Sequence, residues 1–149
     1  MKASEFYLTF AEHDYHLKNV GFKKKANNKY INGSKVEINI ALDRWGWDDE
    51  RGWGFLVRML DMNGVDTEKF ERPRRMSDIR FSSLVKEGLM GDEEQAELYE
   101  PLVHSHPKVY EQTNMWFAFY DKDDLKKVLE KIMPLVAVSA SKWAQNLDS

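Results

Sequence analysis

The sequence predicts a single α+β domain over residues 1–149, in which an antiparallel sheet of about four strands carries the N- and C-terminal helices on one face. Three observations support this fold class. Apolar residues recur at helical spacing near both ends of the chain, and the segment from Val36 to Leu42 alternates strictly between apolar and polar residues. No internal repeat or flexible linker divides the 149 residues, a length that fits one domain.

The first predicted element is an amphipathic helix over residues 3–20. Its apolar stripe consists of Phe6, Phe10, Leu17 and Val20. Ser4 is a suitable N-cap, and Gly21 is expected to end the helix in a left-handed conformation, with Phe22 folding back over the last turn.

A β-hairpin is predicted after the basic run 23–25, which is expected to be solvated. Residues 30–31 form its first arm, 32–34 its turn and 35–45 its second arm. The apolar face of the second arm holds Val36, Ile38, Ile40 and Leu42, and the polar face holds Glu37, Asn39, Ala41 and Asp43. A third strand over 53–62 is apolar on both faces, which indicates an interior position in the sheet.

The second half of the chain begins with an ambiguous stretch, residues 63–111. Within it, 77–86 and 92–99 are each compatible with a short helix. A fourth strand is predicted over 114–121, and a helix from about Lys122. The stripe of that helix consists of Leu125, Val128, Leu129, Ile132 and Met133. Pro134 either kinks this helix or begins a second one.

Composition excludes several classes of protein. The chain has no cysteine, so it has no disulfide, thiolate nucleophile or thiolate zinc site. No apolar run is long enough to span a membrane, and the first residues lack the pattern of a signal peptide, so a cytoplasmic location is expected. A net charge of −3 gives no general attraction to nucleic acid or to an anionic membrane.

One part of the sequence resembles a known family. The N-terminal helix followed by Gly21-Phe22-Lys23-Lys24-Lys25, Tyr30 and a strand ending near Trp45 is similar to a bacterial family known only as a domain of unknown function. The similarity covers residues 5–62 and, more loosely, 115–143, whereas 72–111 has no counterpart. The family pattern has a helix, a GFKKK-type turn, two strands, a Trp-containing strand and a C-terminal helix. The resemblance implies this fold, and it transfers no activity or catalytic residue.

Aromatic residues suggest a binding surface on the polar face of the sheet. If the second arm of the hairpin stays regular, Trp45 and Trp47 continue that face, and large exposed aromatics there are typical of a ligand groove or partner site. The alternatives are a bulge at 43–44 that turns both rings into the core, or coverage by 72–111.

Three further residues extend this predicted site. Trp116 and Tyr120 share one face of the fourth predicted strand and would enlarge the aromatic patch. Arg58 would orient an anionic group.

The four histidines suggest an alternative function. His13 and His16 lie three residues apart on the predicted first helix, and together with His104 and His106 they offer ligands for zinc, nickel or ferrous iron. The spacing is not that of metalloproteases, and His13 lies near the centre of an apolar stripe, where a hydrogen-bonded core histidine is the usual finding.

A basic cluster suggests a second alternative. Arg72, Arg74 and Arg75 would contact the phosphates of a single-stranded nucleic acid. The acidic net charge, and the acidic block at 91–111, favour pairing within the chain or between copies of it instead.

Together these patterns predict a non-catalytic binding module without a cofactor. Its partner would be a protein, in an immunity-type or regulatory role, or a small ligand, and a homo-oligomer stays open. One version is a small acidic domain that neutralises a basic partner by charge complementarity. The sequence disfavours an enzyme without excluding one, because the P-loop, the G-x-S-x-G elbow and the G-x-G-x-x-G fingerprint are absent.

Overall fold

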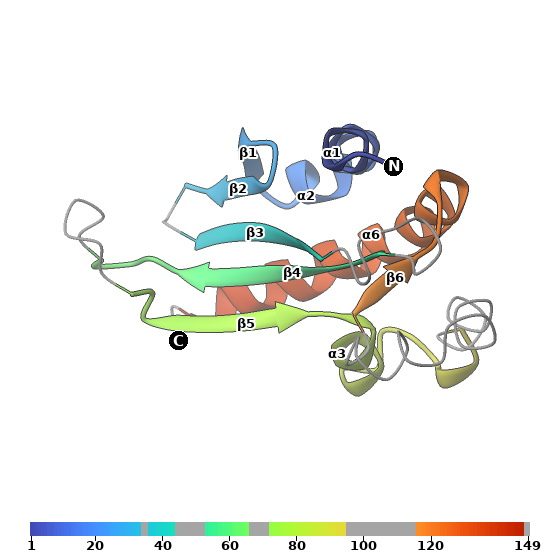
Figure 1. The fold of residues 1–149 in the computed structure, drawn as a ribbon. Coiled ribbons are helices and arrows are strands. Elements are labelled where there is room, and N and C mark those ends of the chain that lie inside the picture. The colour runs from blue at the N-terminus through green and yellow to red at the C-terminus, as the bar shows by residue number, and fades with distance from the viewer. Residues whose placement is uncertain (34–35, 44–52, 66–71, 95–115, 148–149) are drawn as a thin grey trace.

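The structure is a computed structural model that describes residues 1–33, 36–43, 53–65, 72–94 and 116–147. An antiparallel sheet carries the N- and C-terminal helices, which confirms the α+β prediction (Figure 1). Within these residues the sheet has six strands, so the prediction of about four was wrong.

The sheet follows the order β1-β2-β3-β4-β5, and β6 pairs with β4. The strands are β1 (Phe22–Ala26), β2 (Lys29–Asn32), β3 (Val36–Asp43), β4 (Trp53–Asp61), β5 (Arg75–Ile79) and β6 (Phe117–Phe119). Both β5 and β6 lie along the same edge of β4, since Val57 pairs with Ile79 and Phe55 pairs with Phe117. The chain therefore leaves this edge of β4 after β5, and it pairs with the same edge again in β6.

Two predicted strands are confirmed in the centre of the sheet. Val36, Ile38 and Ile40 of β3 are buried, as their alternation predicts. Strand β4 pairs on both edges, with β3 on one side and with β5 and β6 on the other, which explains its apolar residues on both faces.

Strands β1 and β5 were not predicted. The basic run 23–25 was expected to be a solvated connection, but it forms most of β1, and its lysines are exposed because β1 is an edge strand. Residues 77–86 were judged compatible with one short helix. Instead, 77–79 belong to β5, where pairing with β4 fixes them, and a helix begins only at Phe81.

The N-terminal helix is divided in two, so the prediction of one helix over 3–20 was wrong. Helix α1 (Ala3–Ala11) and helix α2 (Tyr15–Asn19) are separated by a turn. Asp14 in this turn is 3% exposed and binds the hydroxyl of Tyr30, which holds the turn against β2. Lys2 occupies the N-cap position, so the prediction of Ser4 there was also wrong.

The turn after α2 agrees with its prediction. Gly21 has φ +98°, a left-handed conformation that favours glycine, and Phe22 beyond it is fully buried.

The remaining helices are α3 (Phe81–Lys86) and α6 (Lys122–Asn146). Asp121 caps α6 by accepting a hydrogen bond from the backbone N–H of Asp124 at 2.9 Å. The helix continues through Pro134 as one element of 25 residues, so a second helix does not begin there. All five residues of its predicted stripe are buried. Of the predicted helix 92–99, residues 92–94 are helical and 95–99 lie outside the described residues.

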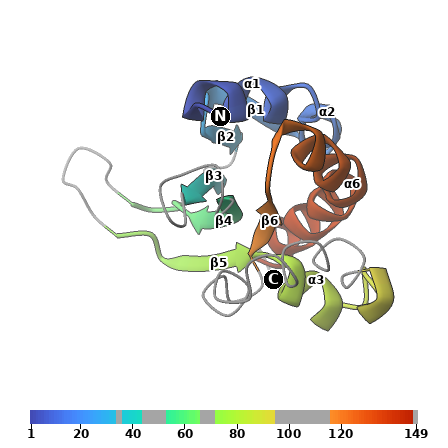
Figure 2. The same cartoon turned by 45° about the vertical axis from the view of Figure 1, so that its right-hand side comes forward.

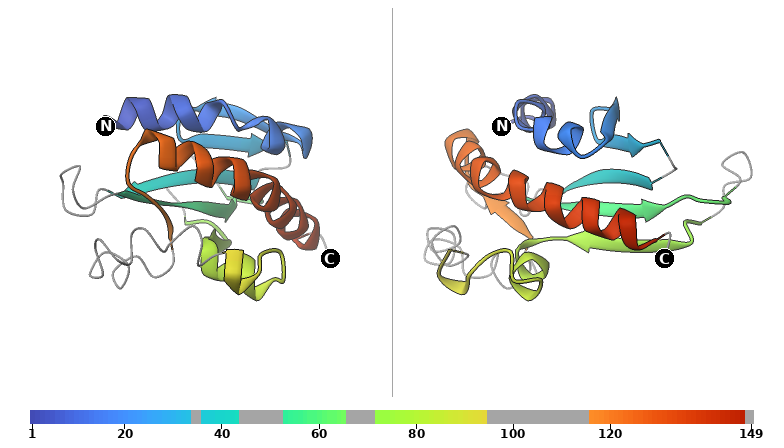
Figure 3. Two further views of the ribbon diagram at one scale, coloured as in Figure 1. Left: turned by 90° about the vertical axis from the view of Figure 1, so that its right-hand side faces the viewer. Right: turned by 180° about the vertical axis from the view of Figure 1, so that it is seen from behind.

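The helices α1, α2 and α6 pack together on one face of the sheet (Figure 2). Aromatic rings fill the space between them. Phe6 of α1 stacks on Phe119 of β6 with centroids 5.7 Å apart, and lies 5.2 Å from the ring of Phe55 in β4. Helix α6 lies behind the sheet in Figure 1 and in front of it in the reverse view of Figure 3, so Figure 1 looks onto the opposite sheet face.

Candidate functional site

The sheet face opposite α6, here called the open face, is defined by the pleat of the strands. Side chains alternate between faces, and the register aligns them across the sheet. The residues with described side chains that the pairing places on the open face, together with Gly54, are Lys23, Lys29, Ile31, Glu37, Asn39, Ala41, Leu56, Arg58, Leu60, Met76, Asp78 and Ala118.

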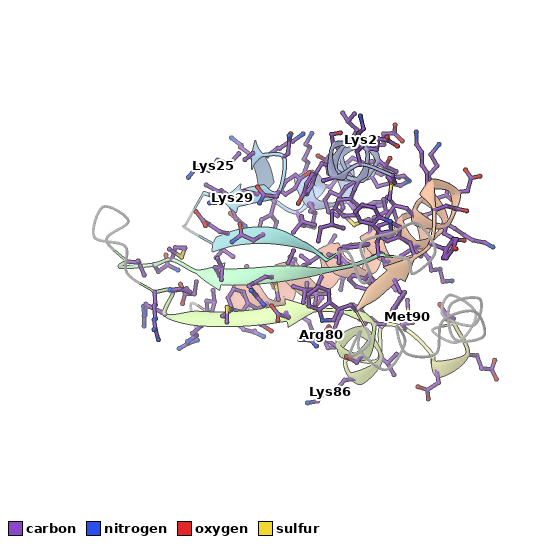
Figure 4. All side chains as sticks on the ribbon, viewed as in Figure 1. Lys2, Lys25, Lys29, Arg80, Lys86 and Met90 are labelled. Atoms are coloured by element: carbon purple, nitrogen blue, oxygen red, sulfur yellow. The ribbon has the colours of Figure 1, made fainter. Side chains whose placement is uncertain are left out.

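The β1–β2 side of the open face is basic. Glu37 of β3 lies 4.0 Å from the Nζ atoms of both Lys25 and Lys29. The side chains of these two lysines are 58% and 35% exposed, whereas that of Glu37 is 14% exposed. One carboxylate thus faces the ammonium groups of two lysines, Lys25 and Lys29, which are labelled in Figure 4. Lys23 on the same face adds a further exposed cation.

A second charged cluster lies where β4 meets β5. Arg58 donates two hydrogen bonds to Asp78, from Nε to Oδ1 at 2.8 Å and from Nη2 to Oδ2 at 3.3 Å. Arg80 donates to the same Oδ2 at 3.3 Å. The hydrogen bonds from the guanidinium to the Asp78 carboxylate raise the pKa of Arg58, so its charge is firmly held.

The apolar residues of the open face are buried at one end of the sheet and more exposed at the other. Leu56 and Ala118 are 1% exposed, so the end near β6 is buried. Toward the other end, Leu60 is half-buried and its pairing partner Met76 is 58% exposed. An exposed thioether beside a half-buried leucine is the kind of apolar surface that partners cover.

Only some of the residues predicted to form the binding site can be placed on the open face. Trp45 and Trp47 lie outside the described residues. Arg58 lies on the open face, as predicted, but Asp78 already occupies two of its donors. Trp116 and Tyr120 flank β6 rather than lying within it; both are half-buried, and Tyr120 packs against the core.

The first histidine pair has ordinary local partners. His13 Nδ1 lies 3.1 Å from the backbone oxygen of Thr9, and the ring of His16 lies against Tyr15 with centroids 4.1 Å apart. His104 and His106 lie outside the described residues. Within the part of the chain that the structure describes, no group of three or more His, Cys, Asp or Glu side chains could hold a metal ion.

The arginines of the nucleic-acid alternative are all exposed. Arg72 and Arg74 precede β5, and Arg75 begins it, at the end of the strand pair where Arg75 faces Asp61.

A buried polar contact positions the sheet beneath the helices. Tyr30 of β2 is fully buried and its hydroxyl donates to Oδ2 of Asp14 at 2.8 Å. Lys18 lies 3.3 Å from the other oxygen of Asp14. Burial, together with the bond to the Asp14 carboxylate, raises the pKa of Tyr30 well above its ordinary value, so this phenol stays protonated.

An open hollow of about 430 Å³ lies on the helix side rather than on the open face. It is lined by Glu5, Leu8, Thr9, Ala11, Glu12 and Lys122. Leu8 is 70% exposed, so the hollow is a surface feature of α1.

Sequence reasoning missed Asp78, Met76 and the strand role of the lysines. A signal for β1 was present, because Asn27 and Asn28 between the lysines and Tyr30 suit a two-residue hairpin turn. Asp78 gave no signal, since its role depends on the register of β5 against β4.

Comparison of the chain with protein-family models, with curated proteins and with solved structures finds no match. None of the helices in the described ranges is long and apolar enough to cross a membrane.

Proposed function

We propose that this protein is a non-catalytic binding domain that engages a protein partner, in an immunity-type or regulatory role, through the open face of its sheet. The observation that carries the proposal is the exposed Met76, which lies beside Leu60 on a surface bordered by charged clusters. An apolar centre with a polar rim is the usual composition of a protein interface.

The breadth of the open face favours a protein partner over a small ligand. Small-molecule sites are concave and largely apolar. The open face instead offers side chains from five neighbouring strands, which suits a broad contact.

The proposal keeps the other expectations from the sequence. Trp45 and Trp47 stay predicted contributors to the surface, a cytoplasmic location is retained, and the resemblance of residues 5–62 to a bacterial family supports the fold without adding an activity. The described residues contain no cluster of metal ligands that would favour a metal-dependent enzyme over a binding domain.

Replacing Met76 tests the proposal. Partners captured from the native host with wild type would be purified, and their Kd measured by calorimetry with wild type, Met76→Gln and Leu8→Gln. Glutamine has a similar length to methionine and no charge, so Met76→Gln removes apolar contact alone. We expect it to weaken binding by about 1–2 kcal/mol, or roughly 5–30-fold.

Leu8→Gln is the matched control, because Leu8 is an exposed apolar residue on the helix side. It should leave Kd within about twofold of wild type, a change of under 1 kcal/mol. Unchanged affinity in Met76→Gln, or a loss confined to Leu8→Gln, would place the interface elsewhere.

A further inference from the structure

We infer that the partner presents an acidic protein surface to the open face, which attracts it through Lys23, Lys25 and Lys29 and binds it at Arg58. The inference rests on the proposed function and specifies the chemistry of its partner. It reverses the sequence-based expectation of an acidic domain that neutralises a basic partner.

The described side chains of the open face include more cations than anions, whereas the whole chain has a net charge of −3. The basic ones on or beside this face are Lys23, Lys25, Lys29, Arg58 and Arg80, and the acidic ones are Glu37 and Asp78. Asp43 pairs with Gly54 in the same register, and its side chain lies outside the described part of the structure. Glu37 lies near both Lys25 and Lys29 and neutralises one charge, so positive charge is left over in this lysine cluster.

The arginine cluster supplies oriented donors. Asp78 holds Arg58 through two hydrogen bonds, while the Arg58 side chain stays 39% exposed. A guanidinium fixed in this way loses little conformational freedom when it binds a carboxylate, and its planar fork matches carboxylate geometry. Lys23 and Lys25, by contrast, have long and exposed side chains, so they act mainly by attracting a partner from a distance.

Protection of the sheet edge accounts for only part of these charges. Lysines on an edge strand commonly prevent pairing with other chains, and this explains the exposed lysines of β1. It does not explain Lys29 on β2 or Arg58 on β4, which are both interior strands. An acidic partner bound to the open face would give these two residues a role.

An acidic protein fits this surface better than a nucleic acid. The two carboxylates, Glu37 and Asp78, would repel phosphates, whereas a protein can offer its own lysines or hydroxyls to them. None of the residues that strand pairing places on the open face carries an aromatic ring on which bases could stack; Trp116 precedes β6, and Trp45 and Trp47 lie outside the described residues. Its apolar members, such as Leu60 and Met76, suit protein side chains instead.

The test uses poly-L-glutamate as an acidic probe and a thymidine-only DNA oligonucleotide as the nucleic-acid probe. Fluorescence anisotropy would give the Kd of each between about 50 and 200 mM NaCl. We expect poly-L-glutamate to bind more tightly than the DNA at each salt concentration, and its affinity to fall as salt screens the charges.

Two double variants with the same change in net charge locate the effect. Lys23→Glu with Lys25→Glu changes the open face, and Lys122→Glu with Lys127→Glu changes exposed positions on α6. We expect the first to weaken poly-L-glutamate binding roughly tenfold and the second to leave it within about twofold. Urea midpoints and circular dichroism would establish that both variants are folded.

Three results would overturn the inference: no binding of poly-L-glutamate at low salt, equal losses in the two double variants, or tighter binding of the DNA that is lost with the first variant. The last result would assign the surface to nucleic acid. Met76→Gln could weaken binding of the native partner while Lys23→Glu with Lys25→Glu leaves it unchanged. In that case the open face is the interface, and the inference of an acidic partner is wrong.

A further variant tests the arginine anchor. Arg58→Lys keeps the charge but loses the two-point hydrogen bonding to Asp78 and the planar fork. We expect affinity for poly-L-glutamate to fall about threefold with the salt dependence unchanged. Affinity equal to that of wild type would show that Arg58 contributes charge alone.

Discussion

Replacing Tyr30 by phenylalanine tests how the helices are attached to β2. The Tyr30 hydroxyl lies 2.8 Å from Oδ2 of Asp14, and both side chains are buried. Phenylalanine keeps the ring and its contact with Phe10, whose centroid lies 6.0 Å away. The substitution therefore removes the hydroxyl alone and leaves the buried carboxylate with one donor fewer.

The expected loss of stability follows from this geometry. A hydrogen bond to a charged group contributes about 1.5–3 kcal/mol. Lys18 still lies 3.3 Å from the other carboxylate oxygen, but its side chain is 53% exposed, so water screens this ion pair. We expect Tyr30→Phe to lower the free energy of unfolding by about 2 kcal/mol, which corresponds to about 4–8 °C in Tm for a chain of this length.

Urea denaturation followed by circular dichroism measures this loss. Tyr15→Phe is the matched control, because Tyr15 is 52% exposed. The control should stay within about 0.5 kcal/mol of wild type. A Tyr30→Phe midpoint equal to that of wild type, or equal losses in the two variants, would refute the assigned role of the Asp14 contact.

The same contact predicts a pH dependence. The folded protein raises the pKa of Tyr30, chiefly through burial, so the folded state holds this proton more tightly than the unfolded state. The resulting stability is complete below the unfolded pKa, about 10, and is lost as the pH rises above it. The difference in unfolding free energy between wild type and Tyr30→Phe should narrow above about pH 10. A constant difference across that range would contradict the assignment.

Two backbone features give further predictions. Gly21→Ala forces a side chain into φ +98° with its Cβ 3.4 Å from Asn32, so we expect a loss of about 1–2 kcal/mol by urea denaturation. Gly33→Ala, where a Cβ meets nothing within 4 Å, should cost less, and equal losses would argue against backbone strain. Asp121→Ala removes the cap of α6 and should cost about 1 kcal/mol. The neighbouring Asp123→Ala is its control, and a matching loss there would indicate a general charge effect.

Local periodicity was sufficient to predict the central elements of the fold. The alternation in β3, the two apolar faces of β4 and the stripe of α6 each reflect burial imposed on a regular element. Strand β1 was hidden because three consecutive lysines carry no alternation. It is a strand because its backbone pairs with β2.

Features that depend on contacts between distant residues could not be predicted. The break after α1 depends on a bond between Asp14 and Tyr30, which are 16 positions apart. Arg58 was predicted to orient an anionic group at the aromatic patch; the register places it on the open face, and its binding role stays a prediction. Its partner Asp78 could not be identified without the β4–β5 register, which places the two residues opposite each other in an ion pair. Trp45 and Trp47 stay predictions.

The most direct test of the central claim is NMR mapping of amide chemical shifts on the full chain, titrated with its purified partner from the native host. The open-face account predicts the largest shifts at Lys29, Arg58, Met76 and their neighbours in β1, β2, β4 and β5, diminishing as salt is added. Shifts concentrated on α1 and α6, with the open face unchanged, would contradict it.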